Sequence, residues 1–170
     1  MFKRLFLLLA GLVGLALLAT VTGFLLPVGH EAAVSARFDA APSVLFGVIS
    51  DVEHYPEWRS DVERIEVLSD SGEALRFRAH GADGIITYVV EESVRSSLLR
   101  VRIDDDSLPY GGTWTYVLQP FDNGTSLTIT ENGEVYNPLY RLIAAVALSQ
   151  TATIQRYLND LAGAAALQGP

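Results

Sequence analysis

The sequence predicts an α+β domain, with an antiparallel sheet packed on a C-terminal helix, attached to one transmembrane helix. Three observations lead to this prediction. An uncharged run of 22 residues lies near the N-terminus, six segments of strand-like composition follow one another, and a helical apolar pattern closes the chain. With 170 residues, the chain has room for one domain of ordinary size beyond the run.

The apolar run extends from Leu5 to Leu26 and contains no charged residue. As a helix it would be about 33 Å long, close to the roughly 30 Å hydrocarbon core of a bilayer. A cleaved signal peptide is the alternative, but its apolar part usually has about 7–15 residues. The nearest cleavage-like pattern, Val34-Ser35-Ala36, lies inside a predicted strand. We therefore expect residues 1–29 to form an uncleaved anchor that meets the membrane through residues 5–26, and residues 30–170 to form one domain.

The charges flanking the run predict its orientation. Lys3 and Arg4 precede it, whereas the residues directly after it carry no net positive charge. Because positive flanks stay in the cytoplasm, we expect a cytoplasmic N-terminus and a domain on the periplasmic or cell-surface side. Without Lys3 and Arg4, the rest of the chain has 10 basic and 20 acidic residues, which gives a formal net charge of −10. Such a domain is neither a nucleic-acid binder nor attracted to anionic lipid.

The domain is predicted to begin with a strand over Glu31–Phe38, where apolar and polar residues alternate. A helix over 41–49 follows, with Pro42 in its first turn, and a second short helix is expected over Pro56–Asp61. Six segments rich in β-branched and aromatic residues come next, separated by short turn sequences that indicate an antiparallel meander. They are Glu63–Ser69, Ala74–Ala79, Ile85–Val94, Leu98–Ile103, Thr113–Gln119 and Ser126–Tyr136. Gly133, inside the last segment, predicts a bend or bulge.

One long helix is predicted to close the chain. Asn137 is a natural N-cap, and Pro138 suits the first turn. Apolar residues then recur at helical spacing in a stripe wide enough to face a sheet. The stripe consists of Leu139, Leu142, Ile143, Val146, Ile154, Tyr157, Leu158 and Leu161.

Two segments in the first half of the domain carry a resemblance to a known family. They are Phe38–Phe46 and Asp51–Trp58, the latter ending in Tyr-Pro-Glu-Trp and followed by the strand Val62–Leu68. With the order of elements, they resemble the SRPBCC superfamily, the START-related helix-grip proteins that include polyketide cyclase/dehydrase-like and lipid-transport domains. The resemblance covers about residues 32–161. It implies a curved sheet wrapped around the C-terminal helix, with a cavity between them.

In such a fold, the inner face of the sheet and the helix stripe would line the cavity. Trp114 and Tyr116 alternate with threonines and are expected to face the helix, and Glu131 shares the parity of Ile129. Glu131 thus either places a carboxylate inside or is turned outward by a bend at Gly133. The candidate ligand-binding residues are Phe77, Trp114, Tyr116, Ile129, Glu131, Leu142, Val146, Gln150 and Thr153.

The sequence predicts no metal site, no catalytic set and no cofactor. It has no cysteine, and His30, His54 and His80 are isolated from one another. The favoured function is therefore non-enzymatic binding of a lipid or other hydrophobic small molecule by a membrane-anchored domain. Two alternatives remain: a polyketide cyclase- or lyase-like enzyme, for which Glu131, His54 or a tyrosine would supply the acid and base, and a protein-interaction module.

Overall fold

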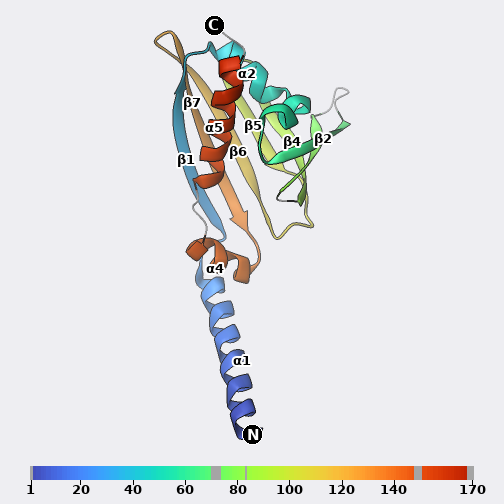
Figure 1. The fold of residues 1–170 in the computed structure, drawn as a ribbon, viewed down its shortest axis with the longest axis vertical. Coiled ribbons are helices and arrows are strands. Elements are labelled where there is room, and N and C mark those ends of the chain that lie inside the picture. Colours follow the sequence, from blue (N-terminus) through green and yellow to red (C-terminus); the bar gives the residue numbers. More distant parts are fainter. Residues whose placement is uncertain (1, 70–73, 83, 148–150, 168–170) are drawn as a thin grey trace.

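The computed structural model describes residues 2–69, 74–82, 84–147 and 151–167. A long helix projects from one end of a domain in which helices cover one face of a single sheet (Figure 1). The helices are α1 (Phe2–Leu25), α2 (Pro42–Ser50), the 3-10 helix η1 (Val52–His54), α3 (Tyr55–Trp58), α4 (Pro138–Ala147) and α5 (Ala152–Leu167). The strands are β1 (Gly29–Phe38), β2 (Val62–Ser69), β3 (Arg76–Gly81), β4 (Gly84–Val94), β5 (Leu98–Ile103), β6 (Tyr110–Phe121) and β7 (Gly124–Val135).

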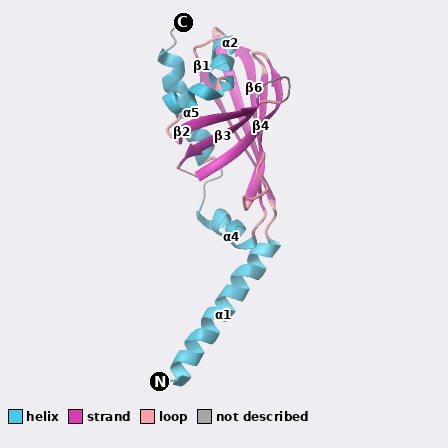
Figure 2. Cartoon of the chain, turned by 90° about the vertical axis from the view of Figure 1, so that its right-hand side faces the viewer, coloured by secondary structure: helices cyan, strands magenta, loops and turns pink. Residues whose placement is uncertain are grey.

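The N-terminal apolar run forms α1, which stands clear of the domain along most of its length (Figure 2). Its 24 residues are about 36 Å long. Among the described residues, it is the one helix long and apolar enough to cross a membrane. Its exposed leucines and phenylalanines have no protein partner along the projecting part, so this surface is suited to lipid.

The seven strands form one antiparallel sheet in the order β1-β7-β6-β5-β4-β3-β2. Strands β2 to β7 are thus a meander, as predicted, and β1 adds to the edge at β7. The β1–β7 register is unbroken from Gly29 opposite Glu134 to Phe38 opposite Thr125. Because Val34–Ala36 lies within β1, cleavage after Ala36 would leave only Arg37 and Phe38 of this edge strand.

Apolar side chains on the inner face of the sheet pack against α5 and α2. The largest fully buried ones include Leu99, Leu127 and Ile129 of the sheet, and Ile154 and Leu161 of α5. The other face carries ion pairs such as Arg100–Glu92, Arg102–Glu91 and Arg76–Asp104. Because exposed ion pairs contribute only about 0–1 kcal/mol each, the inner face supplies most of the stability.

The expected single C-terminal helix is wrong: the structure has α4 and α5 in its place. Ile154, Tyr157 and Leu161 of α5 are buried on the sheet, whereas Leu139 and Ile143 of α4 are exposed. Instead of the sheet, α4 packs on the end of α1 (Figure 2). Two consecutive helices with the same phase give the same apolar stripe as one long helix, so periodicity did not distinguish them. The predicted N-cap is confirmed, since Asn137 Oδ1 accepts the N–H of Leu139 at 2.9 Å.

The bulge expected at Gly133 is also absent. Both neighbouring strands keep their register through this residue. A Cβ on Gly133 would overlap the imidazole ring of His30, which lies directly across from it on β1. The His30 ring occupies the space that a larger side chain at 133 would take, and the strand continues with Glu131 on the inner face.

The division into α4 and α5 predicts different effects for the same substitution in the two helices. Ile154→Ala removes a side chain that is 0% exposed and is expected to lower the free energy of unfolding by about 2–5 kcal/mol. The matched change Ile143→Ala, at a position 54% exposed, is expected to stay within about 0.5 kcal/mol. Thermal or denaturant unfolding of the full chain in detergent measures both. Equal losses would mean that one continuous helix covers the sheet.

Candidate functional site

Aromatic rings form a continuous chain between α5 and the inner face of the sheet. Tyr157 of α5 is its centre, with ring-centroid distances of 5.2 Å to Trp58, 5.4 Å to Tyr116 and 6.0 Å to Trp114. From Trp58 the chain continues through Tyr55 and Phe77 to Tyr88. Both tryptophans and four of the seven tyrosines of the sequence are in it. The interior is thus lined by rings in contact, mostly edge to face.

Each part of this interior comes from a local feature of the chain. Trp114 and Tyr116 alternate along β6, which places both on the inner face. Tyr157 lies on the buried face of α5, one turn after Ile154. The segment after α3 is tied to α5 because the backbone N–H and the hydroxyl of Ser60 both donate to Asp160 at 2.8 Å. This tie holds Trp58 against Tyr157.

A mostly buried ion pair borders the rings. Arg59 donates to both carboxylate oxygens of Asp61, from Nε at 3.1 Å and from Nη2 at 2.6 Å, and each side chain is 16% exposed. The guanidinium also lies 4.9 Å from the ring centre of Tyr55 and 5.2 Å from that of Tyr157. Burial alone would raise the pKa of Asp61, but the hydrogen bonds and charge of Arg59 outweigh it and lower that pKa. The pair is therefore ionised at neutral pH.

Two hydrogen-bond groups in this interior have no partner among the described residues. They are the indole Nε1 of Trp58 and the hydroxyl of Tyr157, both fully shielded from solvent. The Tyr157 hydroxyl lies near those of Tyr116 and Tyr55, which act on its pKa, but it forms no hydrogen bond of good geometry with them. Burial raises the pKa of the Tyr157 hydroxyl well above its ordinary value, and that of Tyr116 as well. Both phenols therefore stay protonated. The interior presents hydrogen-bond donors that are not used within the described structure.

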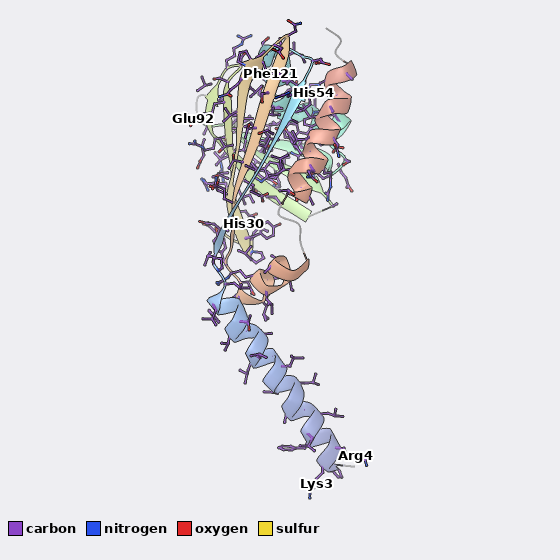
Figure 3. The ribbon with its side chains drawn as sticks, turned by 90° about the vertical axis from the view of Figure 1, so that its left-hand side faces the viewer. Lys3, Arg4, His30, His54, Glu92 and Phe121 are labelled. Carbon is purple, nitrogen blue, oxygen red and sulfur yellow. The ribbon has the colours of Figure 1, made fainter. Side chains whose placement is uncertain are left out.

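A second polar group lies at the end of the inner face nearest α4. Glu131 is half-buried beside Trp114, its partner across the β6–β7 ladder, and near His30 of β1, which Figure 3 shows at this end of the sheet. Burial raises the pKa of Glu131, opposed by the charge of His30 and a hydrogen bond from Trp114. His54 is exposed and lies toward the opposite end of the domain in Figure 3, so it does not join this group.

Two hollows are found near the sheet. One of about 30 Å³ lies beside Arg59, Asp61 and Tyr88, and has room for about one water-sized group. A larger one of about 260 Å³ is lined by residues such as Arg102, Thr113 and Glu134, on the face away from α5. Among the described residues, no cluster of three or more acidic or histidine side chains is placed to hold a metal.

The structure brings together five of the nine predicted ligand-binding residues. Phe77, Trp114, Tyr116 and Ile129 face the interior and belong to the core or pack on it, and Glu131 is at its edge. Leu142 and Thr153 do not join them. Leu142 is half-buried on α4, away from the core, and Thr153 is exposed on α5. Val146 lies on α4, and Gln150 is outside the described residues.

Sequence reasoning missed Arg59, Asp61 and the central place of Tyr157. A signal for the pair was present: an arginine and an aspartate two residues apart follow directly on the Tyr-Pro-Glu-Trp segment. Their position under α5 was not readable, because it depends on the Ser60–Asp160 contact across 100 residues.

The chain was compared with known families, proteins and structures. A family model described as polyketide cyclase/dehydrase and lipid transport matches residues 29–166. No curated protein sequence matches. Among solved structures, the Zhui aromatase/cyclase from Streptomyces sp. R1128 is similar, at 15% identity and a TM-score of 0.67, over 84% of this chain and 96% of that one.

Two further structures extend the comparison. A START superfamily protein from Mycobacterium smegmatis has 16% identity and a TM-score of 0.64, over 82% of this chain and 99% of that one. Norcoclaurine synthase from Thalictrum flavum, in complex with a transition-state analogue, has 11% identity and a TM-score of 0.67, over 84% of this chain and 98% of that one. At these identities the similarity establishes the fold, which unrelated functions share.

The raised pKa of Glu131 predicts how stability changes with pH. The folded protein holds the Glu131 proton to higher pH than the unfolded chain, so this residue makes stability fall as pH rises above its ordinary pKa of 4.5. Glu131→Gln removes that fall. The variant is expected to have a higher Tm than the wild type at pH 7.5 and the same Tm at pH 4, by thermal unfolding. The control is the same substitution, Glu134→Gln, at an exposed position of the same strand. A Glu131→Gln variant that tracks this control would contradict the burial of the carboxylate.

Proposed function

The chain belongs to the polyketide cyclase/dehydrase and lipid transport family, and on that premise we propose that it binds a hydrophobic small molecule, such as a lipid, between α5 and the sheet. In this proposal, residues 30–170 form the binding domain, and residues 1–29 anchor it to a membrane through the apolar run 5–26. The ligand carries at least one oxygen that accepts a hydrogen bond. Apolar contact gives most of the binding free energy, about 25 cal/mol per Å² of surface removed from water.

The observation that carries the proposal is the pair of buried donors without partners. A hydrogen-bond group left unsatisfied in a core costs about 1–3 kcal/mol. Trp58 Nε1 and the Tyr157 hydroxyl belong to rings in contact, with centroids 5.2 Å apart, and in this proposal one ligand binds both. A carbonyl, hydroxyl or carboxylate oxygen of the ligand would accept these bonds while its apolar part lies against the rings.

The same residues favour binding over acid–base catalysis. A general base needs a pKa and a position suited to taking a proton. The carboxylate of Asp61 accepts both of its hydrogen bonds from Arg59, and the buried phenols hold their protons at neutral pH. Glu131 and its neighbour His30 lie at the edge of the interior, whereas His54 lies toward the opposite end of the domain (Figure 3). Around Tyr157, the site therefore supplies donors to hold a ligand rather than a matched acid and base.

Removing an unused donor is expected to separate binding from stability. Tyr157→Phe keeps the ring contacts but deletes the unpartnered hydroxyl, so in the ligand-free protein it should raise the free energy of unfolding by about 1 kcal/mol. It should also lower the amount of small molecule retained by the protein. Native mass spectrometry of the full chain, purified from membranes in mild detergent, measures retained ligand, and thermal unfolding measures stability.

The matched control is Tyr55→Phe. Its hydroxyl is buried in the same ring chain but donates to the carbonyl of Ile49 at 2.7 Å, so its loss should cost about 1 kcal/mol and leave ligand retention unchanged. The proposal is wrong if the wild type retains no small molecule, or if Tyr157→Phe loses stability and keeps the ligand.

The proposed anchor has a defined orientation. Lys3 and Arg4 lie at the free end of α1, opposite the domain (Figure 3), so we propose that this end stays in the cytoplasm and the domain lies outside it. A reporter fused after Pro170 that folds only outside the cytoplasm should be active, and the mature chain should keep its N-terminus. Replacing both Lys3 and Arg4 by serine should reduce that activity. Activity from a reporter that works only in the cytoplasm, or a mature N-terminus within β1, would contradict the proposal.

A further inference from the structure

One side of α4 carries large apolar side chains that no described part of the protein covers. Leu139, Tyr140 and Ile143 are 48%, 53% and 54% exposed, and their spacing places them on one face of the helix. Tyr136, just before α4, is 49% exposed. An apolar helix face with tyrosines at its margin is the composition found where proteins meet the boundary between lipid chains and headgroups.

The other side of α4 is fixed to the end of α1. A Cβ on Gly23 would overlap the backbone of Pro138, so the two helices approach as closely as a glycine allows. Arg141 is buried and donates to the carbonyl of Leu26 at 3.0 Å and to that of Tyr136 at 3.1 Å. Its charge lies at the C-terminal end of α1, where the helix dipole favours a cation. The position of α4 is therefore set by α1.

The contact also sets the depth of α4 relative to α1. The described side chains of α1 are exposed as far as Leu18, and burial begins at Ala19, Thr20 and Gly23. From Ala19 to Leu26 is about 10 Å of helix. Because α1 is about 36 Å long and a hydrocarbon core is about 30 Å thick, this last part of α1 is where a span leaves the core. An interfacial helix buries its apolar face about 5–10 Å into the boundary between the headgroups and the acyl chains, which is the depth at which α1 leaves the core.

The charge near α4 differs from that of the rest of the domain. Residues 135–159 contain no aspartate or glutamate and two arginines, Arg141 and Arg156, whereas the whole chain carries −8. The segment that contains α4 therefore carries none of the negative charge of the domain, and Glu134, which accepts a hydrogen bond from Tyr136, lies just before it. No carboxylate of α4 has to be desolvated when the helix enters the headgroup region.

We propose that α4 is an interfacial helix, which lies on the bilayer surface where α1 emerges, with Leu139, Tyr140 and Ile143 immersed among the lipids. This inference rests on the proposed membrane insertion of α1. It adds a second membrane contact, which holds the domain at a fixed angle rather than on a free tether. It also keeps the His30 and Glu131 end of the inner face toward the membrane, as Figure 3 shows for His30 relative to α4.

The test uses the absence of cysteine from the chain. Single cysteines are introduced in the full-length protein at Ile143, at Val94 and at Leu15, and each is labelled with an environment-sensitive fluorophore. Val94 is the matched control, because it is an apolar β-branched residue that is 49% exposed but distant from α4. It is the last residue of β4 and pairs with Leu98, which pairs with Val117. Val117 lies seven residues (about 23 Å) along β6 from Tyr110. The proteins are reconstituted in dioleoylphosphatidylcholine vesicles, with and without brominated phosphatidylcholine.

The expected result is a blue-shifted emission and loss of most fluorescence to brominated lipid for the labels at 15 and 143, and neither effect at 94. A label at 143 that behaves like the one at 94 while the label at 15 is quenched would overturn the interfacial helix and leave the anchor intact. A label at 143 that is blue-shifted but not quenched would also overturn it, because a second copy of the chain would then cover α4. A label at 15 that remains aqueous would overturn the anchor and the inference together. Leu139→Cys repeats the measurement on the same face.

Discussion

The packing of α5 against the inner face of the sheet is the contact on which the rest of the structure depends. Ile154 and Leu161 are fully buried at the two sides of Tyr157, and they close the sheet over a core that also includes Leu127 and Ile129. The strands of β2 to β7 are joined by short turns, but an antiparallel sheet with one uncovered apolar face is not stable in water. The helix supplies that cover, and its position also decides which rings meet at Tyr157.

That core combines two kinds of packing with different consequences. The aliphatic part, around Ile154 and Leu161, contains no polar group that needs a partner. The aromatic part, around Tyr157, contains the unsatisfied Trp58 Nε1 and Tyr157 hydroxyl and borders the Arg59–Asp61 pair. A protein selected only for stability would place phenylalanine at such positions, because the hydroxyl adds desolvation cost without a bond. The aromatic part therefore lowers the free energy of unfolding relative to an all-apolar core, and such a cost is typical of functional sites.

Most of the fold could be predicted from the sequence because it follows from short-range patterns. Alternation placed Trp114, Tyr116 and Ile129 on one face, and turn sequences defined the meander. The failures have a common cause: each depends on a contact between distant residues. Gly133 makes space for His30 across 103 positions, and α4 leaves the sheet because Gly23 and Leu26 of the N-terminal segment receive it. Of the site, the ring residues were predictable, whereas Arg59 and Asp61 were not, because only the tertiary fold brings them under α5.

The separation of α4 from α5 also bears on how a ligand reaches the interior. With α4 turned toward α1, Trp114 and Glu131 stay half-buried. Glu131 pairs with Ala32, two residues from His30, which lies at the end of the sheet that faces the anchor (Figure 3). A hydrophobic molecule leaving a bilayer loses apolar contact at about 25 cal/mol per Å², so a short path through little water keeps that cost low. In the proposed function, the packing of α4 on α1 thus does more than attach the domain: it presents the less covered end of the binding interior to the source of the ligand.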